Sequence, residues 1–214
     1  MRMVSAGLLV AAVYWIAQGL GDLIHQPYGE ERGLSRTFAT VHAGLLLAAA
    51  CFELLPLSLD SARWPVTLTG IVAGIGWWIC VQLYASRKKG MMPSVSLQTA
   101  CLGLALGAAY TPADMVGKKL LIVLCLSAFL QTASGNKSGK SNLGRTAIVM
   151  LGTALGEFAG ETGAELGGAC LALACGVLVA ASYQYLLPEK NKMETAGAGS
   201  TILGLLLGLG IIFL

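Results

Sequence analysis

The stretch GLLLAAACFELLP, residues 44–56, returns later in the chain as GVLVAASYQYLLP, residues 176–188. Seven of the thirteen aligned positions are identical, and the alignment needs no gap. Each copy is an apolar run that finishes on Leu-Leu-Pro, which is typical of the end of a helix, because proline is tolerated there and breaks a helix interior. The chain therefore carries one internal repeat, built from apolar helical sequence.

The composition around the repeat indicates a membrane protein. The chain has 214 residues, of which 56% are hydrophobic and only 12% are charged, against roughly 25% charged residues in a typical soluble domain. So few charged residues cannot make the surface of a soluble protein of this size polar, whereas a surface that faces lipid can be apolar. The 28 glycines favour the same class, because small residues let membrane-spanning helices approach closely. We predict an all-α integral membrane protein.

Eight segments are long and apolar enough to be membrane-spanning helices, which need about 20 mostly apolar residues each. No loop between them is long enough for a separate soluble domain. The sequence predicts a single transmembrane domain over residues 1–214, with spans at about 3–24, 38–57, 65–85, 94–111, 118–135, 146–162, 167–187 and 196–214.

Lysine and arginine are distributed unequally between the two sides of the predicted bundle. Four basic residues lie on one side, namely Arg2, Arg63, Lys118 and Lys119. Ten lie on the other, namely Arg32, Arg36, Arg87, Lys88, Lys89, Lys137, Lys140, Arg145, Lys190 and Lys192. The positive-inside rule then predicts that both termini lie on the outer side, which requires an even number of spans.

The two copies of the repeat end the second and the seventh span. Spans five apart cross the membrane in opposite directions, so the repeat is predicted to be inverted. Inverted repeats are a recurring architecture of secondary transporters, whose sites lie near the midplane between the halves.

Several of these stretches resemble the ZIP family of zinc and iron transporters. Residues 35–60 are similar to its second span, GLALGAAY at 103–110 to the end of its fourth, and 167–189 to its seventh. The glycine- and leucine-rich segment that runs to Leu214 is similar to its eighth span. The resemblance implies a 3+2+3 arrangement, in which spans one to three and six to eight are inverted repeats around spans four and five.

The chain departs from that family at the expected metal ligands. The histidine and acidic residue of the fourth span fall on Gln98 and Leu102, and the ligands of the fifth span fall on Gln131 and Ser134. Zn²⁺ needs deprotonated His, Cys or carboxylate ligands, usually four. We therefore expect no resident metal or other cofactor, and zinc or iron only as a transported ion.

Carboxylates in the predicted spans are further candidates, because ionisable groups are costly in lipid. Glu157, Glu161 and Glu165 recur at intervals of four, so they share a helix face and would favour a cation, unless the stretch leaves the membrane and is solvated. Glu53 lies near the outer end of the second span, where it either guards an entrance or reaches out to water. His42 stands alone in apolar sequence and is expected to bond a neighbouring helix.

Two functions remain open. In the first, the chain keeps the fold but has lost transport, and serves as a structural or accessory subunit; the missing ligands favour this interpretation. In the second, it is a divergent transporter of a divalent metal or small solute, with a path lined by Gln98, Gln131, Ser134, Glu157 and Glu161, and with Glu53 at its mouth. The expected partners are membrane lipids, other membrane subunits or a second copy, and no nucleic acid. No nucleophile–base pair is evident, so no enzyme is expected.

Overall fold

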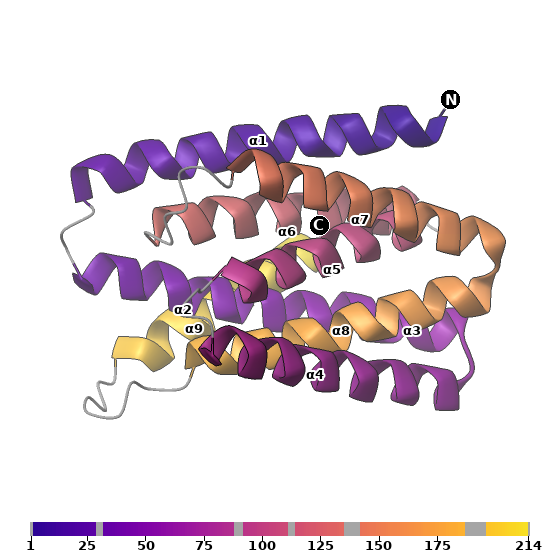
Figure 1. Ribbon diagram of the computed structural model, residues 1–214. Helices are drawn as coiled ribbons and strands as arrows, with labels where there is room; N and C mark the ends of the chain where they lie inside the picture. The colour runs from indigo at the N-terminus through magenta and orange to yellow at the C-terminus, as the bar shows by residue number, and fades with distance from the viewer. Residues whose placement is uncertain are drawn as a thin grey trace.

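The computed structural model describes residues 2–28, 32–87, 92–110, 114–134, 142–186 and 196–213. Within these ranges α2, η1 and α3 continue into one another, so the described residues form eight helices (Figure 1). The all-α prediction is confirmed there. The elements are α1 (Arg2–Tyr28), α2 (Arg32–Ala48), η1 (Ala49–Leu54), α3 (Leu55–Ser61), α4 (Trp64–Arg87), α5 (Met92–Tyr110), α6 (Asp114–Ala133), α7 (Asn142–Thr162), α8 (Ala164–Leu186) and α9 (Ala196–Phe213).

Five of these helices are long and apolar enough to cross a membrane, judged by length and composition. They are α1, the continuous helix from α2 to α3, α4, α6 and α8. Shorter apolar helical runs lie in α5 (Val95–Ala109) and α9 (Gly199–Phe213). The composition of the described helices is thus that of a multi-pass membrane protein.

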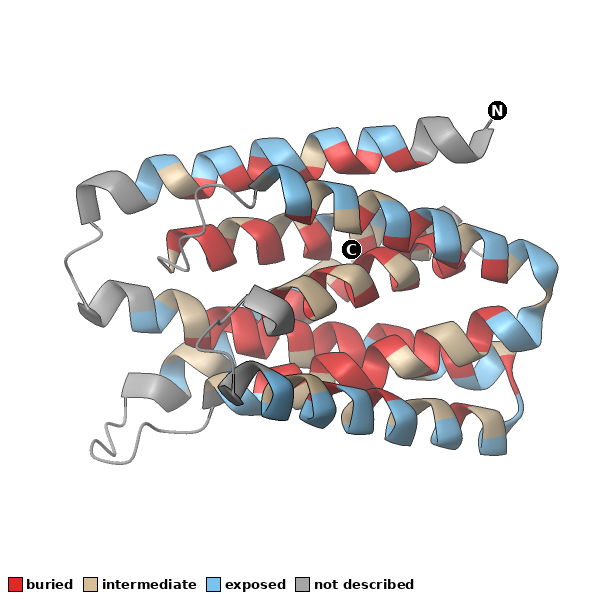
Figure 2. Cartoon of the chain, viewed as in Figure 1, coloured by how far each residue is buried: buried red, intermediate tan, exposed pale blue. Residues whose placement is uncertain are grey.

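The helices lie roughly side by side, and their burial separates an apolar outside from a packed inside. The outward faces of α1 and α4 are exposed, whereas most of α5 and α8 is buried (Figure 2). The exposed faces carry large apolar side chains such as Trp15 on α1, Trp77 on α4 and Phe158 on α7. A large apolar surface of this kind marks contact with lipid or protein.

The bundle has two ends, the Arg36 end and the Glu165 end, each called by a charged residue that lies there. At the Arg36 end, α2, α5, α7 and α9 begin, and α1, α4, α6 and α8 finish; it lies at the left of Figure 1. At the opposite, Glu165 end, Arg63 Nε lies 3.3 Å from Glu165 Oε1 in an exposed ion pair. Of the basic residues counted for orientation, Lys88, Lys89, Lys137, Lys140, Lys190 and Lys192 lie outside the described residues, as do Leu187 and Pro188 of the repeat.

The main helix pairs are α5 with α7, α2 with α9, α4 with α8, and α1 with α6. In addition, α8 packs against α2 and α5, and α6 packs against α2 and α5. Helices α5, α6, α8 and the continuous helix α2–α3 therefore form the inner part of the bundle, where the core lies.

Helices α5 and α7 pack against each other through glycines on both sides. A methyl group at Gly107 would lie 2.0 Å from the Thr153 carbonyl oxygen, and one at Gly156 would lie 2.1 Å from the Leu104 carbonyl oxygen. No real side chain fits at such distances. The GxxxG pair that Gly103 forms with Gly107 thus serves close packing, as small residues do between membrane helices.

The segment η1 is a π-helix inside an otherwise α-helical span. The Leu55 N–H donates to the Ala50 carbonyl oxygen five residues back, and the Cys175 thiol of α8 donates to the same oxygen at 3.3 Å. The physical cause is Pro56, which has no N–H to donate to the Phe52 carbonyl and whose ring would crowd it. The π-turn re-pairs the backbone just before the proline.

The glycine contact between α5 and α7 predicts a large effect of one methyl group. We expect Gly156→Ala to lower the free energy of unfolding by about 1–3 kcal/mol, the usual cost of overpacking, because the clash is with backbone. Thermal melting in detergent measures this. Gly76→Ala is the matched control, since a methyl group there meets nothing within 4 Å; equal melting of the two variants would contradict the packing.

Candidate functional site

Polar side chains from four helices meet inside the bundle. This central polar cluster consists of His42 on α2, Gln98 on α5, Ser127 and Gln131 on α6, and Tyr185 on α8. The first four are at most 3% exposed. Burying polar groups without hydrogen bonds is costly, and in a bilayer no water is at hand to satisfy them. Such a cluster in the interior of an apolar bundle is therefore a candidate functional site.

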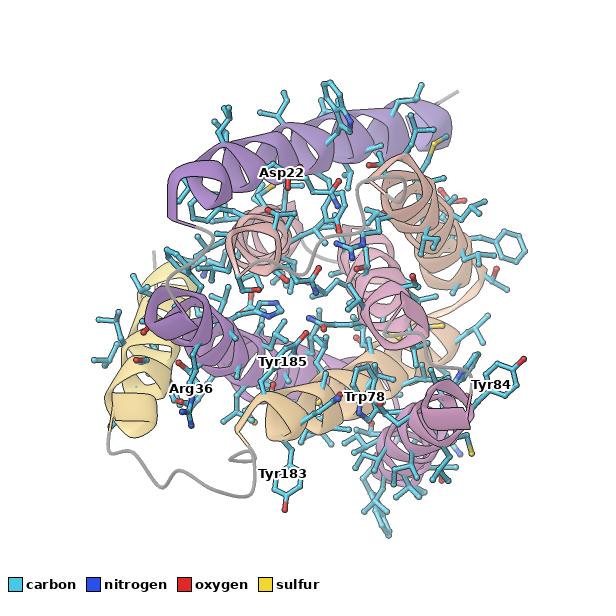
Figure 3. All side chains as sticks on the ribbon, turned by 60° about the vertical axis from the view of Figure 1, so that its left-hand side comes forward. Asp22, Arg36, Trp78, Tyr84, Tyr183 and Tyr185 are labelled. Atoms are coloured by element: carbon cyan, nitrogen blue, oxygen red, sulfur yellow. The ribbon has the colours of Figure 1, made fainter. Side chains whose placement is uncertain are left out.

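The cluster is organised around the His42 ring. His42 Nε2 lies 2.7 Å from Ser127 Oγ and 3.2 Å from Gln98 Nε2. Tyr185 meets the ring edge-on, with centroids 5.4 Å apart and an interplanar angle of 67°, and Gln131 lies beside the Tyr185 hydroxyl. The side chain of Tyr185 lies inside the bundle between α2 and α8, whereas that of Tyr183 points away from it (Figure 3).

A second polar group lies between α1, α5 and α7. The Tyr14 hydroxyl faces Gln18 and Thr99 and is close enough to Arg145 for an electrostatic interaction. It makes no hydrogen bond of good geometry with a described residue, and neither does either amide atom of Gln18. Arg145 also interacts electrostatically with Tyr185, so the guanidinium group relates this second group to the central polar cluster.

Arg145 was expected in a loop before the sixth span, and this prediction is wrong. Helix α7 begins earlier, at Asn142, and Arg145 lies in its first turns with only 4% of the residue exposed. The apolar run that suggested a start at 146 is preceded by a helical turn whose Arg145 side chain packs inward. One basic residue of the predicted loop therefore belongs to the interior.

The polar residues occupy the half of the bundle near the Arg36 end. Toward the Glu165 end they are followed by a leucine layer of four buried residues in the same core cluster: Leu46 on α2, Leu102 on α5, Leu124 on α6 and Leu178 on α8. Each is one to two turns beyond the polar residue on its own helix. The centre is thus polar in one half and closed by packed leucines in the other.

Two of the predicted path residues, Gln98 and Gln131, do come together around His42. Leu102, the fourth-span position that had lost its acidic residue, lies in the leucine layer. Ser134 lies at the end of α6, where its hydroxyl donates to the Gln131 carbonyl oxygen at 2.8 Å. The expected bond from His42 to a neighbouring helix is confirmed by Ser127.

The predicted carboxylates do not join the cluster. Glu53 is eleven residues beyond His42 on the same continuous helix, about 16 Å away at 1.5 Å per residue. Its side chain does not reach out to water: the residue is 9% exposed, and Lys119 of α6 is an electrostatic neighbour. Glu157 is half-buried and Glu161 is exposed; both lie about 18 Å or more along α7 from Arg145.

The sequence analysis missed several residues of the site, namely Tyr14, Gln18, Thr99, Ser127 and Tyr185. A usable signal was present in the amides. Gln18, Gln98 and Gln131 each lie inside an apolar span, where an uncharged amide is costly unless it is hydrogen-bonded. Of these three amides, only Gln98 and Gln131 align with ligand positions of the ZIP family.

No family model matches the chain. Nor does any curated protein match it. The function is therefore inferred from the chemistry of the site and the packing of the helices.

Removal of one partner in the cluster should be measurable as lost stability. Ser127→Ala leaves His42 Nε2 without its shorter hydrogen bond, and we expect a loss of about 1–3 kcal/mol, the cost of an unsatisfied buried group. Thermal melting in detergent tests this against Thr69→Ala, whose hydroxyl is exposed and bonds only its own helix at Pro65. Identical melting temperatures would show that the bond from α6 to α2 does not stabilise the fold.

Proposed function

We propose that the chain is a multi-pass membrane transport protein of ZIP-like architecture, which passes a small polar solute through the central polar cluster. The observation that carries the proposal is a buried set of polar side chains, contributed by α2, α5, α6 and α8, in the middle of an apolar bundle. A purely structural subunit has no need of such a set, since polar groups in a membrane interior are costly and mark solute pathways.

The helix packing supports the inverted repeat that this architecture requires. In an inverted repeat of this kind, α1 corresponds to α7, the helix α2–α3 to α8, α4 to α9, and α5 to α6. When each helix is replaced by its counterpart, every main helix pair becomes another main helix pair. The pair α2 with α9 becomes α8 with α4, and α5 with α7 becomes α6 with α1. The lesser pair α5 with α8 becomes α6 with α2. Repeats around a central pair of spans would produce this pattern.

Glycines in the two copies make equivalent contacts. A methyl group at Gly44 would lie 2.2 Å from the Thr201 carbonyl oxygen of α9, and one at its repeat partner Gly176 would lie 2.2 Å from the Ile71 carbonyl oxygen of α4. In the reverse direction, a methyl group at Gly204 would lie 2.0 Å from the Val41 carbonyl oxygen of α2.

In the second reverse contact, a methyl group at Gly74 would lie 2.3 Å from the Leu173 carbonyl oxygen of α8. Val41 and Leu173 stand at equal distances before the glycines that begin the two copies. The same four-point contact is thus made on both sides of the bundle, which supports the repeat at the level of single residues.

The ZIP-like assignment gains support from the place of Gln98 and Gln131. The resemblance puts two metal-ligand positions there, and both side chains are buried in the central polar cluster. The donor types differ from that family, however, because the cluster contains amides, hydroxyls and one imidazole. We therefore propose a related path with different chemistry, in a membrane orientation with both termini outside.

A second function, that of an accessory subunit without transport, is favoured by the leucine layer. Leu46 and Leu178 are fully buried, and Leu102 and Leu124 nearly so. A centre closed in this way holds helices together whether or not it ever opens.

Flux into proteoliposomes separates the two functions. We expect vesicles with the purified protein to take up at least one of four probes, namely ZnCl₂, MnCl₂, urea and glycerol, faster than empty vesicles. The same flux should fall to the empty-vesicle rate in Gln131→Leu, because the variant removes an amide from the cluster. Absence of uptake for all four probes would leave the accessory subunit as the better proposal.

The repeat makes its own prediction. Gly44→Ala and Gly176→Ala should lower the melting temperature by similar amounts, since both place a methyl group 2.2 Å from a carbonyl oxygen, and Gly19→Ala, which meets nothing within 4 Å, should not. A loss of stability at only one of the two glycines would argue against equivalent copies.

A further inference from the structure

We propose that the central site takes uncharged small solutes that both donate and accept hydrogen bonds, and that it rejects divalent cations. This inference rests on the proposed transport function and names its substrate class. It is carried by the hydrogen-bonding state of His42 and Gln98, together with the unsatisfied polar atoms of Gln98 and of the second polar group.

The lone pair of the imidazole is already in use. An amide nitrogen can only donate, so the contact from Gln98 Nε2, at 3.2 Å, is a hydrogen bond in the tautomer in which His42 Nε2 accepts and Nδ1 carries the ring proton. Ser127 Oγ, at 2.7 Å, then donates to the same atom. A metal ion needs that lone pair, but two donors converge on it, so the cluster is arranged around a neutral imidazole.

Several polar atoms of the central polar cluster and of the second polar group have hydrogen-bonding capacity to spare. Gln98 Oε1 is an acceptor with no partner among the described residues, and neither amide atom of Gln18 makes a hydrogen bond of good geometry there. The Tyr14 hydroxyl faces Gln18 and Thr99 without such a bond. All three residues are at most 1% exposed. The spare atoms include donors and acceptors alike. A solute that offers both, such as an amide or a polyol, is complementary to them.

The charges around the site disfavour a cation. Among the described residues, no three His, Cys, Asp or Glu side chains are grouped so as to hold a metal, and the carboxylates of Glu53 and Glu157 lie toward the far end of the bundle. The charged group that interacts with both Tyr14 and Tyr185 is the Arg145 guanidinium. A guanidinium group offers no lone pair to a metal ion.

Uptake measured in parallel for charged and uncharged probes tests the substrate class. Proteoliposomes of the full chain are mixed with urea or glycerol and followed by light scattering, and separate vesicles that enclose a zinc-sensitive dye are mixed with ZnCl₂. We expect urea or glycerol permeability about tenfold above that of empty vesicles, a change that corresponds to about 1.4 kcal/mol in the barrier, and no zinc signal.

Variants assign the flux to the site. Gln98→Leu should reduce urea and glycerol flux to the empty-vesicle rate, whereas Gln98→Asn, which keeps a shorter amide, should retain part of it. Gln82→Leu is the matched control, because this amide pairs with Gln184 away from the cluster and its loss should leave the flux unchanged. Melting in detergent identifies any variant that has failed to fold. If Gln98→Leu does not fold, the flux through Gln98→Asn tests the site, and it should lie below that of the unchanged protein.

Each result bears on the inference in a definite way. Zinc uptake without urea or glycerol uptake would overturn the substrate class and leave the proposed transport function standing. Neutral flux that persists in folded Gln98→Leu would overturn the assignment to this site. Absence of flux for every probe would overturn the transport function itself, and the substrate class with it.

Discussion

The architecture depends on helices that approach until backbone meets backbone. In lipid, apolar side chains gain little from leaving one apolar surface for another, so association relies on close packing. The chain meets this constraint with glycines on both members of a pair. Gly107 and Gly156 do so for α5 and α7, and Gly44 and Gly204 for α2 and α9. The positions of these glycines fix which helices are neighbours, and those neighbours bring the polar residues of α2, α5, α6 and α8 together.

Close packing also explains how the centre can be polar and closed at once. Because the inner helices are held by their outer partners, they can bury His42 and Gln98 next to one another and still seal the adjoining half with leucines. The hydrogen bonds from Ser127 and Gln98 satisfy the ring, while Gln98 Oε1 stays unpartnered. The bundle is thus compact and still contains a buried hydrogen-bond acceptor without a partner among the described residues.

The fold could be predicted from the sequence in its class and in its segments. Apolar length gave spans close to the helices found, because lipid allows few other structures. Two details escaped. The helix start before Arg145 was not predicted, because hydropathy places a guanidinium group outside a span. The π-helix was not predicted, because Pro56 is the single residue that indicates it.

The candidate site was predictable in part. Gln98 and Gln131 were selected through a resemblance, while Ser127 and Tyr185 depend on helix rotation and neighbour choice, which apolar periodicity does not reveal in a bundle that is apolar on nearly every face. The carboxylates Glu157 and Glu161 share a face, as their spacing requires, but that face lies at the wrong depth for the cluster.

The π-helix η1 has a consequence for how the two copies of the repeat can diverge. A π-turn holds one residue more than an α-turn between the same flanking helices. Loss of one residue within 49–54, together with replacement of Pro56, would convert η1 to α-helix and leave the faces of α2 and α3 as they are. The same deletion in α8 would rotate everything beyond it by about 100° and move Tyr185 away from His42. One copy therefore tolerates a change in length that the other does not, and over evolutionary time the two halves are free to drift apart unequally.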